Sequence, residues 1–476
     1  MLFNSFNFLI FFSIVATIHY LPIPVWLRKC NLVLASYLFY ASWTWEFLPL
    51  LMFTTVFDYI LANKMSSAES PYVRKGLCFL GVSMGLLLLA IFKFRVFIHN
   101  TAIIIINAHS HMSLLAWEPI ETIPLGISFY TFESISYLVD VYRRRCQTAR
   151  NLLDYSLFIS FFPHLLAGPI VRPNDLLPQF HALGRPSRDQ LGWGLSLVTI
   201  GLFQKIVVAD QMAHIADNIF ASSGRCGCLE MWIGSFAFGL QIYCDFSGYS
   251  CCAIGLALML GLVINQNFNA PYAAVGLSDF WRRWHISLST WLRDYLYIPM
   301  GGNRCGNLRT LVNLMVTMFL GGLWHGASWT FAVWGLVHGM FLVVQRLLVR
   351  WCSYRMKEIF ASSWAQLALC GCTFLLVDLS WVLFRTRTIG SVGQEYLTML
   401  GYGVPQHGVK VLPSEIFEVA TLVFCVFALH WRVRLKGTWA MWADLGWKFR
   451  SMLLCAMIML ILLTPGEKID FIYFQF

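Results

Sequence analysis

Apolar stretches of roughly membrane-spanning length recur along almost the whole chain, with short polar interruptions between them. A transmembrane helix needs about 20 mainly apolar residues, and the stretch 2–27 has no Lys or Arg before Arg28 and Lys29. A cleaved signal peptide would carry basic residues before its apolar core, so we expect a first transmembrane helix with its N-terminus outside. Further candidate spans are 31–45, 46–62, 77–96, 123–140, 152–171, 193–209, 229–247, 249–264, 307–325, 327–347, 364–384, 414–431 and 450–465.

The distribution of basic residues orients these spans. Clusters at 143–145, 346–357 and 432–436 all fall on the cytoplasmic side when the spans alternate from an outside N-terminus, as the positive-inside rule requires. The basic residues between 172 and 188 then fall on the opposite side, so we expect that one of the two spans flanking them does not cross. The pattern predicts an all-α polytopic membrane protein with about 11 to 14 crossings.

The least apolar long stretch is 265–310, which has turn-forming Asn, Pro and Gly residues near both ends. Between these ends, Ser278 and Asp279 suit a helix start. Trp281, Trp284, His285, Leu288 and Leu292 then recur at helical spacing, opposite a row of charged residues. Lipid cannot solvate a charged helix. We therefore expect a re-entrant or interfacial helix that forms the cytoplasmic mouth of the site.

Composition agrees with this picture and narrows the function. Hydrophobic residues make up 58% of the 476-residue chain and charged residues only 12%, about half the share found in soluble proteins. The net charge of +10 is confined to short clusters beside apolar spans, which indicates membrane topology and not nucleic-acid binding. None of the 14 Cys residues forms a CxxC pair, so the sequence predicts neither a metal site nor a disulfide framework.

His325 is the strongest catalytic candidate in the apolar part of the chain. It stands in "FLGGLWHGASWTFAVWGLVHG", residues 319–339, and lies 16 residues after Arg309, or roughly 24 Å along a helix. Ionisable groups this deep in a bilayer are costly and usually functional. His285 is the second candidate, whereas His338 falls on another face of the helix and is expected to pack or to hydrogen-bond a neighbouring helix.

Two sequence blocks give a specific resemblance. "DFWRRWHISLSTWLRDYLYIPMGGNR" (279–304) and "GGLWHGASWTFAVWGLVHG" (321–339) resemble the membrane-bound O-acyltransferase family. "IPLGISFYTFESISYLVDVYR" (123–143), "FFPHLLAGPIVRP" (161–173), "QIYCDFSGYS" (241–250) and "FIYFQF" (471–476) are similar to its bacterial branch for alginate and other exopolysaccharides. The pattern differs at His164, where the family usually has Gln, and at Cys251 and Cys252, where it has Asp-Met.

The resemblance implies a family fold with re-entrant helices around a central funnel, formed by a single membrane domain over 1–476. Within it, 265–310 is the polar re-entrant segment and 307–349 the catalytic-histidine helix pair. His325 corresponds to the family's active-site histidine and His285 to its second functional histidine. Further residues are assigned as binding acetyl-CoA at the cytoplasmic mouth (Arg282, Arg283, Arg293 and Arg304) or as lining the substrate tunnel (Trp324, Asn303, Asp245 and Tyr243).

The function implied is transfer of an acetyl group across the bacterial inner membrane. Acetyl-CoA serves as a cytosolic co-substrate, with no permanently bound cofactor, and an extracytoplasmic partner acetyltransferase delivers the group to an exopolysaccharide such as alginate. Imidazole suits the role of general base for an acceptor hydroxyl. Two alternatives are D-alanyl or other acyl transfer to a cell-envelope polymer and, from a different class, a transporter for an acyl donor or glycan.

The C-terminal segment "DFIYFQF", residues 470–476, is too apolar to lie in water and too short to span a membrane. One interpretation is that it docks at the outer mouth of the cavity or on the extracytoplasmic partner. The other is an interfacial aromatic anchor.

Overall fold

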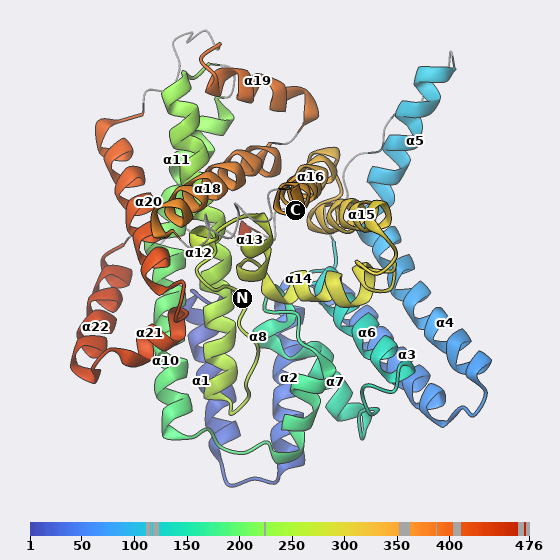
Figure 1. Cartoon of the computed structure of the whole chain (residues 1–476). Coiled ribbons are helices and arrows are strands. Elements are labelled where there is room, and N and C mark those ends of the chain that lie inside the picture. The colour runs from blue at the N-terminus through green and yellow to red at the C-terminus, as the bar shows by residue number, and fades with distance from the viewer. Residues whose placement is uncertain are drawn as a thin grey trace. The chain divides into compact units, whose positions relative to one another are not determined.

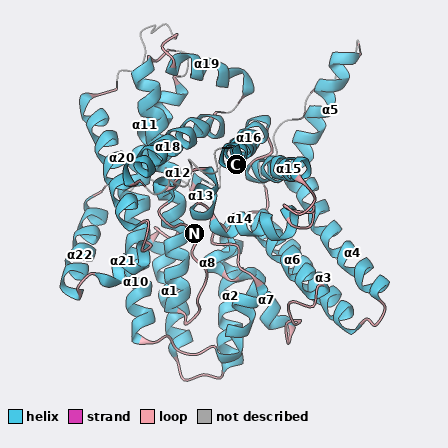
Figure 2. Cartoon of the chain, viewed as in Figure 1, coloured by secondary structure: helices cyan, strands magenta, loops and turns pink. Residues whose placement is uncertain are grey.

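A computed structural model describes residues 1–110, 115, 117, 123–222, 225–351, 362–386, 388–402, 411–464 and 471–472. Within these ranges the regular structure is entirely helical, and Figure 2 shows helices joined by short loops. The all-α prediction is therefore confirmed. The apolar composition explains this result, because a helix satisfies all of its own backbone hydrogen bonds in lipid.

The chain forms two compact units, labelled by helix in Figure 1. The first comprises Met1–Val198 and Cys252–Asn265, and the second Thr199–Cys251 and Gln266–Phe476. The helices within the first unit are α1 (Phe6–Tyr20), α2 (Val25–Thr44), η1 (Trp45–Phe47), α3 (Leu48–Ser67), α4 (Pro71–Leu89), η2 (Ala90–Phe94), α5 (Arg95–His109), α6 (Ile127–Tyr142), α7 (Leu152–Ser160), α8 (Phe162–Leu165), α9 (Pro173–Leu176) and η3 (Leu177–Ala182).

Two helices run through the boundaries of these ranges, namely α10 (Arg188–Phe203) and α12 (Cys228–Met259). The remaining helices belong to the second unit: η4 (Gln204–Ala209), α11 (Asp210–Ala221), η5 (Pro271–Ala273), α13 (Leu277–Arg283), α14 (Ile286–Leu292), η6 (Arg293–Tyr297), α15 (Asn307–His325), α16 (Trp329–Trp351), α18 (Ser363–Arg385), α19 (Ile389–Met399), α20 (Pro413–Val433), α21 (Thr438–Asp444) and α22 (Trp447–Leu463).

Seven helical segments among the described residues are long and apolar enough to cross a membrane. Two of these, of 43 and 39 residues, each contain more than one helix, and shorter apolar helices such as α1 stand beside them. Because these segments are defined by length and composition, the predicted 11 to 14 crossings stay a prediction. The protein is a multi-pass membrane protein. The seven are Val25–Ser67, Pro71–His109, Arg188–Ala221, Cys228–Met259, Trp329–Trp351, Ser363–Arg385 and Pro413–Val433.

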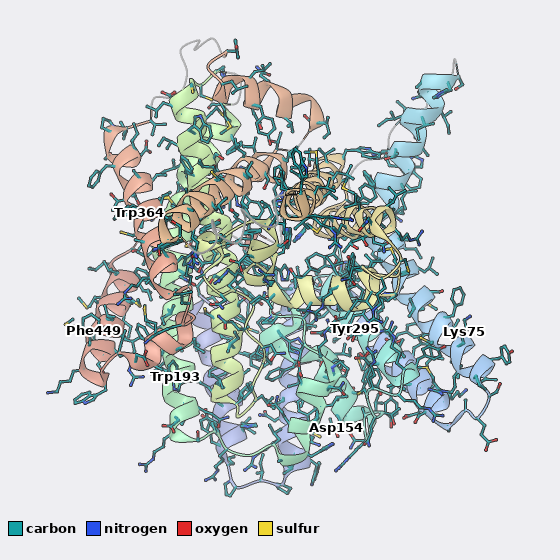
Figure 3. All side chains as sticks on the ribbon, in the orientation of Figure 1. Lys75, Asp154, Trp193, Tyr295, Trp364 and Phe449 are labelled. Carbon is teal, nitrogen blue, oxygen red and sulfur yellow. The ribbon has the colours of Figure 1, made fainter. Side chains whose placement is uncertain are left out.

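The stretch 152–171 does not form a membrane-spanning helix. Its main helix, α7, has nine residues and is only about 14 Å long. Its first turn holds Asp154, labelled in Figure 3, whose carboxylate pairs with the Lys29 ammonium at 2.6 Å. The Arg28 guanidinium also donates to the Leu183 carbonyl at 3.4 Å. The segment after α7 therefore returns to the start of α2, and the expectation that one span flanking the 172–188 arginines does not cross stays a prediction.

The helix pair α15–α16 packs through glycines. A Cβ added at Gly322 would lie 2.3 Å from the Phe331 carbonyl oxygen, and one at Gly335 would lie 2.3 Å from the Met318 carbonyl oxygen. These distances are too short for any side chain. Figure 1 shows the two helices side by side, as small residues at a membrane helix interface permit. The two helices expected within 307–349 are thus packed against each other, and their close packing fixes the end of α15.

Candidate active site

The second unit brings His285 and His325 together. His325 is the last residue of α15 and is 4% exposed, while His285 is fully buried before the first turn of α14. Their ring centroids lie 6.1 Å apart. The two histidines chosen from the sequence therefore belong to one site, although 40 positions separate them in the chain.

Aromatic rings surround this histidine pair. The Trp324 ring lies 5.0 Å from His325 and 5.7 Å from His285 between centroids, so it contacts both imidazoles. Trp334 of α16 packs edge-on to His325 at 5.3 Å, and Phe384 of α18 lies 5.4 Å from it. Apolar walls exclude water and strengthen electrostatic interactions among the groups they enclose. Of these aromatic residues, only Trp324 was assigned to the site from the sequence.

The helix predicted from Ser278 through Leu292 is broken at His285, so that prediction was wrong. Helix α13 ends at Arg283, and His285 adopts the left-handed conformation, with φ of 42°, before α14 begins. Backbone hydrogen bonds hold the break, because Ile286 N–H donates to the Asn267 carbonyl at 2.9 Å and Asn269 N–H donates to the Arg283 carbonyl at 2.9 Å. A left-handed residue other than Gly is costly, which is consistent with a functional constraint on His285.

Asn267 is the polar partner of His285 that sequence reasoning missed. Its side-chain Oδ1 lies 3.2 Å from His285 Nδ1, and the amide is fully buried. Phe246 of α12 covers the imidazole, with centroids 4.7 Å apart and rings nearly perpendicular. Burial lowers the pKa of His285 to about 3, because desolvation disfavours the imidazolium. The only sequence signal for Asn267 was its place in the polar stretch "NQNFNAPY".

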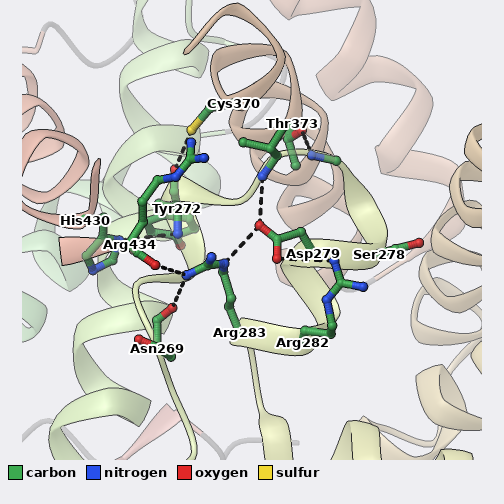
Figure 4. Close-up of polar contacts among 12 residues, drawn as sticks. Asn269, Tyr272, Ser278, Asp279, Arg282, Arg283, Cys370, Thr373, His430 and Arg434 are labelled. Atoms are coloured by element: carbon green, nitrogen blue, oxygen red, sulfur yellow. Dashed lines mark hydrogen bonds and ion pairs between the residues drawn. The ribbon is translucent and has the colours of Figure 1, made fainter. Parts of the chain in front are cut away.

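The four candidate arginines do not share one environment. Arg282, Arg293 and Arg304 are exposed, as expected for groups that meet a soluble anion. Arg283 is different, because its guanidinium pairs with Asp279 at 2.9 Å and donates to the carbonyls of Asn269 and Arg434 at 3.3 Å each. Figure 4 shows Arg283 at the centre of this network. We infer that Arg283 braces the segment that carries His285.

The other residues assigned to the substrate tunnel also lie in different environments. The Asp245 carboxylate of α12 pairs with Lys205 at 2.9 Å, and Lys205 also pairs with Asp210 at 2.8 Å. Tyr243 shares a 2.9 Å hydrogen bond with His430 Nε2. Asn303 is exposed in the turn before α15.

The C-terminal segment reaches into the same unit. Phe471 and Ile472 are 2% and 1% exposed, and Ile472 N–H donates to Asp245 Oδ2 at 2.7 Å. The Phe471 ring lies 4.7 Å from Tyr249 and 6.0 Å from Phe246, the ring that covers His285. Burial of these two residues favours the docked interpretation over an exposed aromatic anchor. The last four predicted tail residues, 473–476, lie outside the described part of the chain.

Two other histidines have structural partners. His338 Nε2 lies 2.9 Å from the Ser380 hydroxyl of α18, which confirms the expected bond to a neighbouring helix. His430 is buried, and its Nε2 shares a 2.9 Å hydrogen bond with the Tyr243 hydroxyl.

Comparisons with known proteins place these residues in a family. The model of the membrane-bound O-acyltransferase family matches residues 147–369. The probable alginate O-acetylase AlgI of Azotobacter vinelandii is 41% identical over 406 residues, covering 85% of this chain and 79% of the relative. The chain belongs to the membrane-bound O-acyltransferase family.

Other relatives of this O-acyltransferase have names that refer to different polymers. The peptidoglycan O-acetyltransferase of Helicobacter pylori is 36% identical over 436 residues, covering 84% of this chain and 80% of the relative. The teichoic acid D-alanyltransferase of Bacillus subtilis is 25% identical over 273 residues, covering 55% of this chain and 69% of the relative. The protein is therefore an enzyme, a membrane O-acyltransferase.

The three positions that the sequence indicated as differing from the family pattern are buried. His164 belongs to the first unit, where its Nδ1 lies 3.1 Å from the Glu133 carboxylate. Glu133 also accepts a hydrogen bond from Val171 N–H at 2.9 Å, so the pair holds the segment after α8. Cys251 and Cys252 are buried in α12. The histidine pair and its aromatic walls are separate residues from all of these.

Proposed function

We propose that the enzyme passes an acetyl group from cytosolic acetyl-CoA across the bacterial inner membrane, for O-acetylation of an exopolysaccharide such as alginate. The observation that carries this proposal is the buried pair of His285 and His325, with ring centroids 6.1 Å apart. The names of the alginate O-acetylase relatives support the acetyl group and the polymer. These relatives are 41–42% identical over 79–85% of this chain, whereas the D-alanyltransferase of Bacillus subtilis matches 55% of it.

In this reaction His325 acts as the general base. Its imidazole takes the proton of the acceptor hydroxyl, and the oxygen attacks the thioester carbonyl carbon of acetyl-CoA. A C–O bond forms, the C–S bond breaks, and the CoA thiolate leaves and takes up a proton. The aromatic rings around His325 keep water from competing for the acetyl group.

Exposed arginines supply the attraction for the donor. Arg282 and Arg293 have side chains that are 72% and 59% exposed, and Arg304 is exposed in the turn before α15. Acetyl-CoA is polyanionic, and a cationic entrance raises its local concentration. Each of the first two arginines also contacts a carboxylate, Asp279 or Asp294, which moderates this effect.

We predict different outcomes for two neighbouring arginines. Arg282→Gln should raise KM for acetyl-CoA with little change in kcat, and the increase should shrink as salt rises, because exposed charges are screened over about 10 Å at 0.1 M. Arg283→Gln should instead lower the thermal transition temperature, since it removes the 2.9 Å ion pair with Asp279 and the donor to the Asn269 and Arg434 carbonyls. Steady-state kinetics and melting curves on both variants decide this. Equal KM for wild type and Arg282→Gln would make Arg282 a topology determinant only.

The acceptor is proposed to be a hydroxyl on an extracytoplasmic partner acetyltransferase, which then acetylates the polymer. A second candidate polymer is peptidoglycan, which the Helicobacter pylori relative favours. Cells that lack this protein would distinguish the two polymers. Acetyl groups missing from secreted polysaccharide support the first, whereas acetyl groups missing only from the cell wall support the second.

Sealed inverted inner-membrane vesicles test the transfer itself. Acetyl-CoA labelled in the acetyl group is added outside, where the cytosolic face is exposed, and both free CoA outside and protected label in the lumen are measured. The proposal expects both products in equal amount, and neither from vesicles that carry His325→Gln. CoA release without label in the lumen would overturn transfer across the membrane. Activity only with a D-alanyl carrier protein would establish the alternative donor.

A further inference from the structure

Asn267 stabilises the interruption between helices α13 and α14 at which His285 lies. Its backbone carbonyl accepts from Ile286 N–H at 2.9 Å, and its side-chain Oδ1 accepts from Ser287 N–H at 3.2 Å and from the Ser287 hydroxyl at 2.9 Å. The amide nitrogen Nδ2 donates to Ser250 Oγ of α12 at 3.2 Å. Asn267 is fully buried, so these contacts replace water completely.

These partners fix the orientation of the amide. A backbone N–H is only a donor, so the side-chain atom that faces Ser287 N–H must be the amide oxygen. Turning the amide over would set its NH₂ group against that N–H and against the Ser287 hydroxyl hydrogen. Two donors facing each other in a buried position are strongly unfavourable.

The fixed amide oxygen in turn fixes the proton on His285. Oδ1 has no hydrogen to donate, so His285 Nδ1, which lies 3.2 Å away, must carry the proton of that hydrogen bond. A neutral imidazole has one N–H, and burial lowers the pKa of His285 to about 3. The other ring nitrogen, Nε2, therefore holds a lone pair and accepts a proton or a hydrogen bond.

We propose that Asn267 is a positioning residue of the acyl-transfer site, which holds the His285 proton on Nδ1 so that Nε2 serves as the proton-accepting nitrogen. The inference rests on the proposed function for its role in catalysis, but not for the state of the ring. A histidine base works only in the correct tautomer, and the group hydrogen-bonded to its other nitrogen sets that tautomer. Asn267 acts through His285 and touches no substrate in this scheme.

Nitrogen NMR tests the state of the ring without any assay of activity. The full-length protein is labelled with ¹⁵N-histidine in nanodiscs, and the signals of His285 are assigned by their loss in His285→Gln. The proposal expects Nδ1 to be protonated and Nε2 unprotonated. Ser287→Ala is the matched control, since it removes a donor from the same oxygen and should leave the tautomer unchanged. A proton on Nε2 in the wild-type protein would overturn the proposal.

The pH profile of Asn267→Asp tests the catalytic role. A carboxylate in this place keeps the acceptor for Nδ1–H but stabilises the imidazolium, so it raises the pKa of His285. Because His285 Nε2 must be unprotonated to accept a proton beside the general base His325, the acidic limb of kcat should move to higher pH, with KM for acetyl-CoA unchanged. The His325 ring, which is also ionisable, lies 6.1 Å from that of His285, so both rings are followed by NMR over the same range.

The outcomes separate the two claims. An upward shift of the acidic limb that follows the His285 signals supports the positioning role. A loss of kcat at every pH, equal in Asn267→Asp and Asn267→Ala, would show that Asn267 is only structural. If Asn267→Ala does not fold, the wild-type spectrum and the Asn267→Asp profile still decide. A confirmed tautomer in a protein without acetyl transfer would overturn the proposed function alone.

Discussion

A His325→Gln variant should reach the membrane at the wild-type level and lose acyl transfer by roughly 10²- to 10⁴-fold, the range that general acid–base catalysis contributes. Glutamine has a similar volume but cannot take up a proton at neutral pH. His325 is 4% exposed, so water cannot readily replace the missing base. The rate of CoA release from acetyl-CoA, normalised to the amount of folded protein, measures the loss.

His338→Gln is the matched control for this variant. It changes a second buried histidine of the same helix pair, whose Nε2 bonds the Ser380 hydroxyl at 2.9 Å. The glutamine amide can make the same bond, so we expect activity within a few-fold of wild type. If His325→Gln retains substantial activity in a well-expressed protein, His325 is not the base. If both variants lose activity equally, disturbed packing of α15 and α16 explains the loss.

Deleting residues 471–476 should leave the protein in the membrane and able to bind acetyl-CoA, but stop delivery of the acyl group to the acceptor. Phe471 packs on Phe246, and Phe246 covers His285, so the tail supports one wall of the histidine pair. Acetyl content of the secreted polysaccharide and binding of acetyl-CoA to the purified protein are the two measurements. Normal acetylation by the truncated protein would show that the tail is only an anchor.

A pair of point variants separates the tail's hydrogen bond from its apolar packing. Ile472→Pro removes the N–H that donates to Asp245, whereas Ile472→Ala keeps it. The lost bond to a buried carboxylate should lower the free energy of unfolding by about 1–3 kcal/mol in the proline variant. Polymer acetylation should fall more in Ile472→Pro than in Ile472→Ala. Equal effects would mean that apolar burial alone holds the tail.

The fold class and the two histidines could be predicted because their signals are local. Apolar runs predict membrane helices by composition. An imidazole inside such a run is easily recognised as a functional candidate, because an ionisable group in a membrane is costly in free energy. The break at His285 could not be predicted in this way, because Trp281, Trp284 and Leu288 keep helical spacing straight through it. The break depends on Asn267, 18 positions earlier, and its hydrogen bonds exist only in the folded chain.

The arginines show the same limit for charged side chains. Arg282 and Arg283 are adjacent and chemically identical, so sequence reasoning assigned both to the donor. The fold separates them, since one points to solvent and the other is held among Asp279, Asn269 and Arg434. This difference depends on Arg434, the residue that follows α20, and on Asn269 in the loop before α13. The spacing of residues along the sequence does not predict that those segments come into contact.

The π-helical turn η4, Gln204–Ala209, lets this part of the enzyme hold an extra residue within a continuous helical segment. A π-turn holds more residues than the α-turn it replaces, and each residue turns a helix by about 100°. Removing one residue between Lys205 and Asp210 would regularise the helix and place the two residues four positions apart, a spacing that keeps them on one face of an α-helix. In an alignment of relatives, a single-residue gap at this turn would therefore mark proteins that can keep the Lys205–Asp210 pair on a regular α-helix.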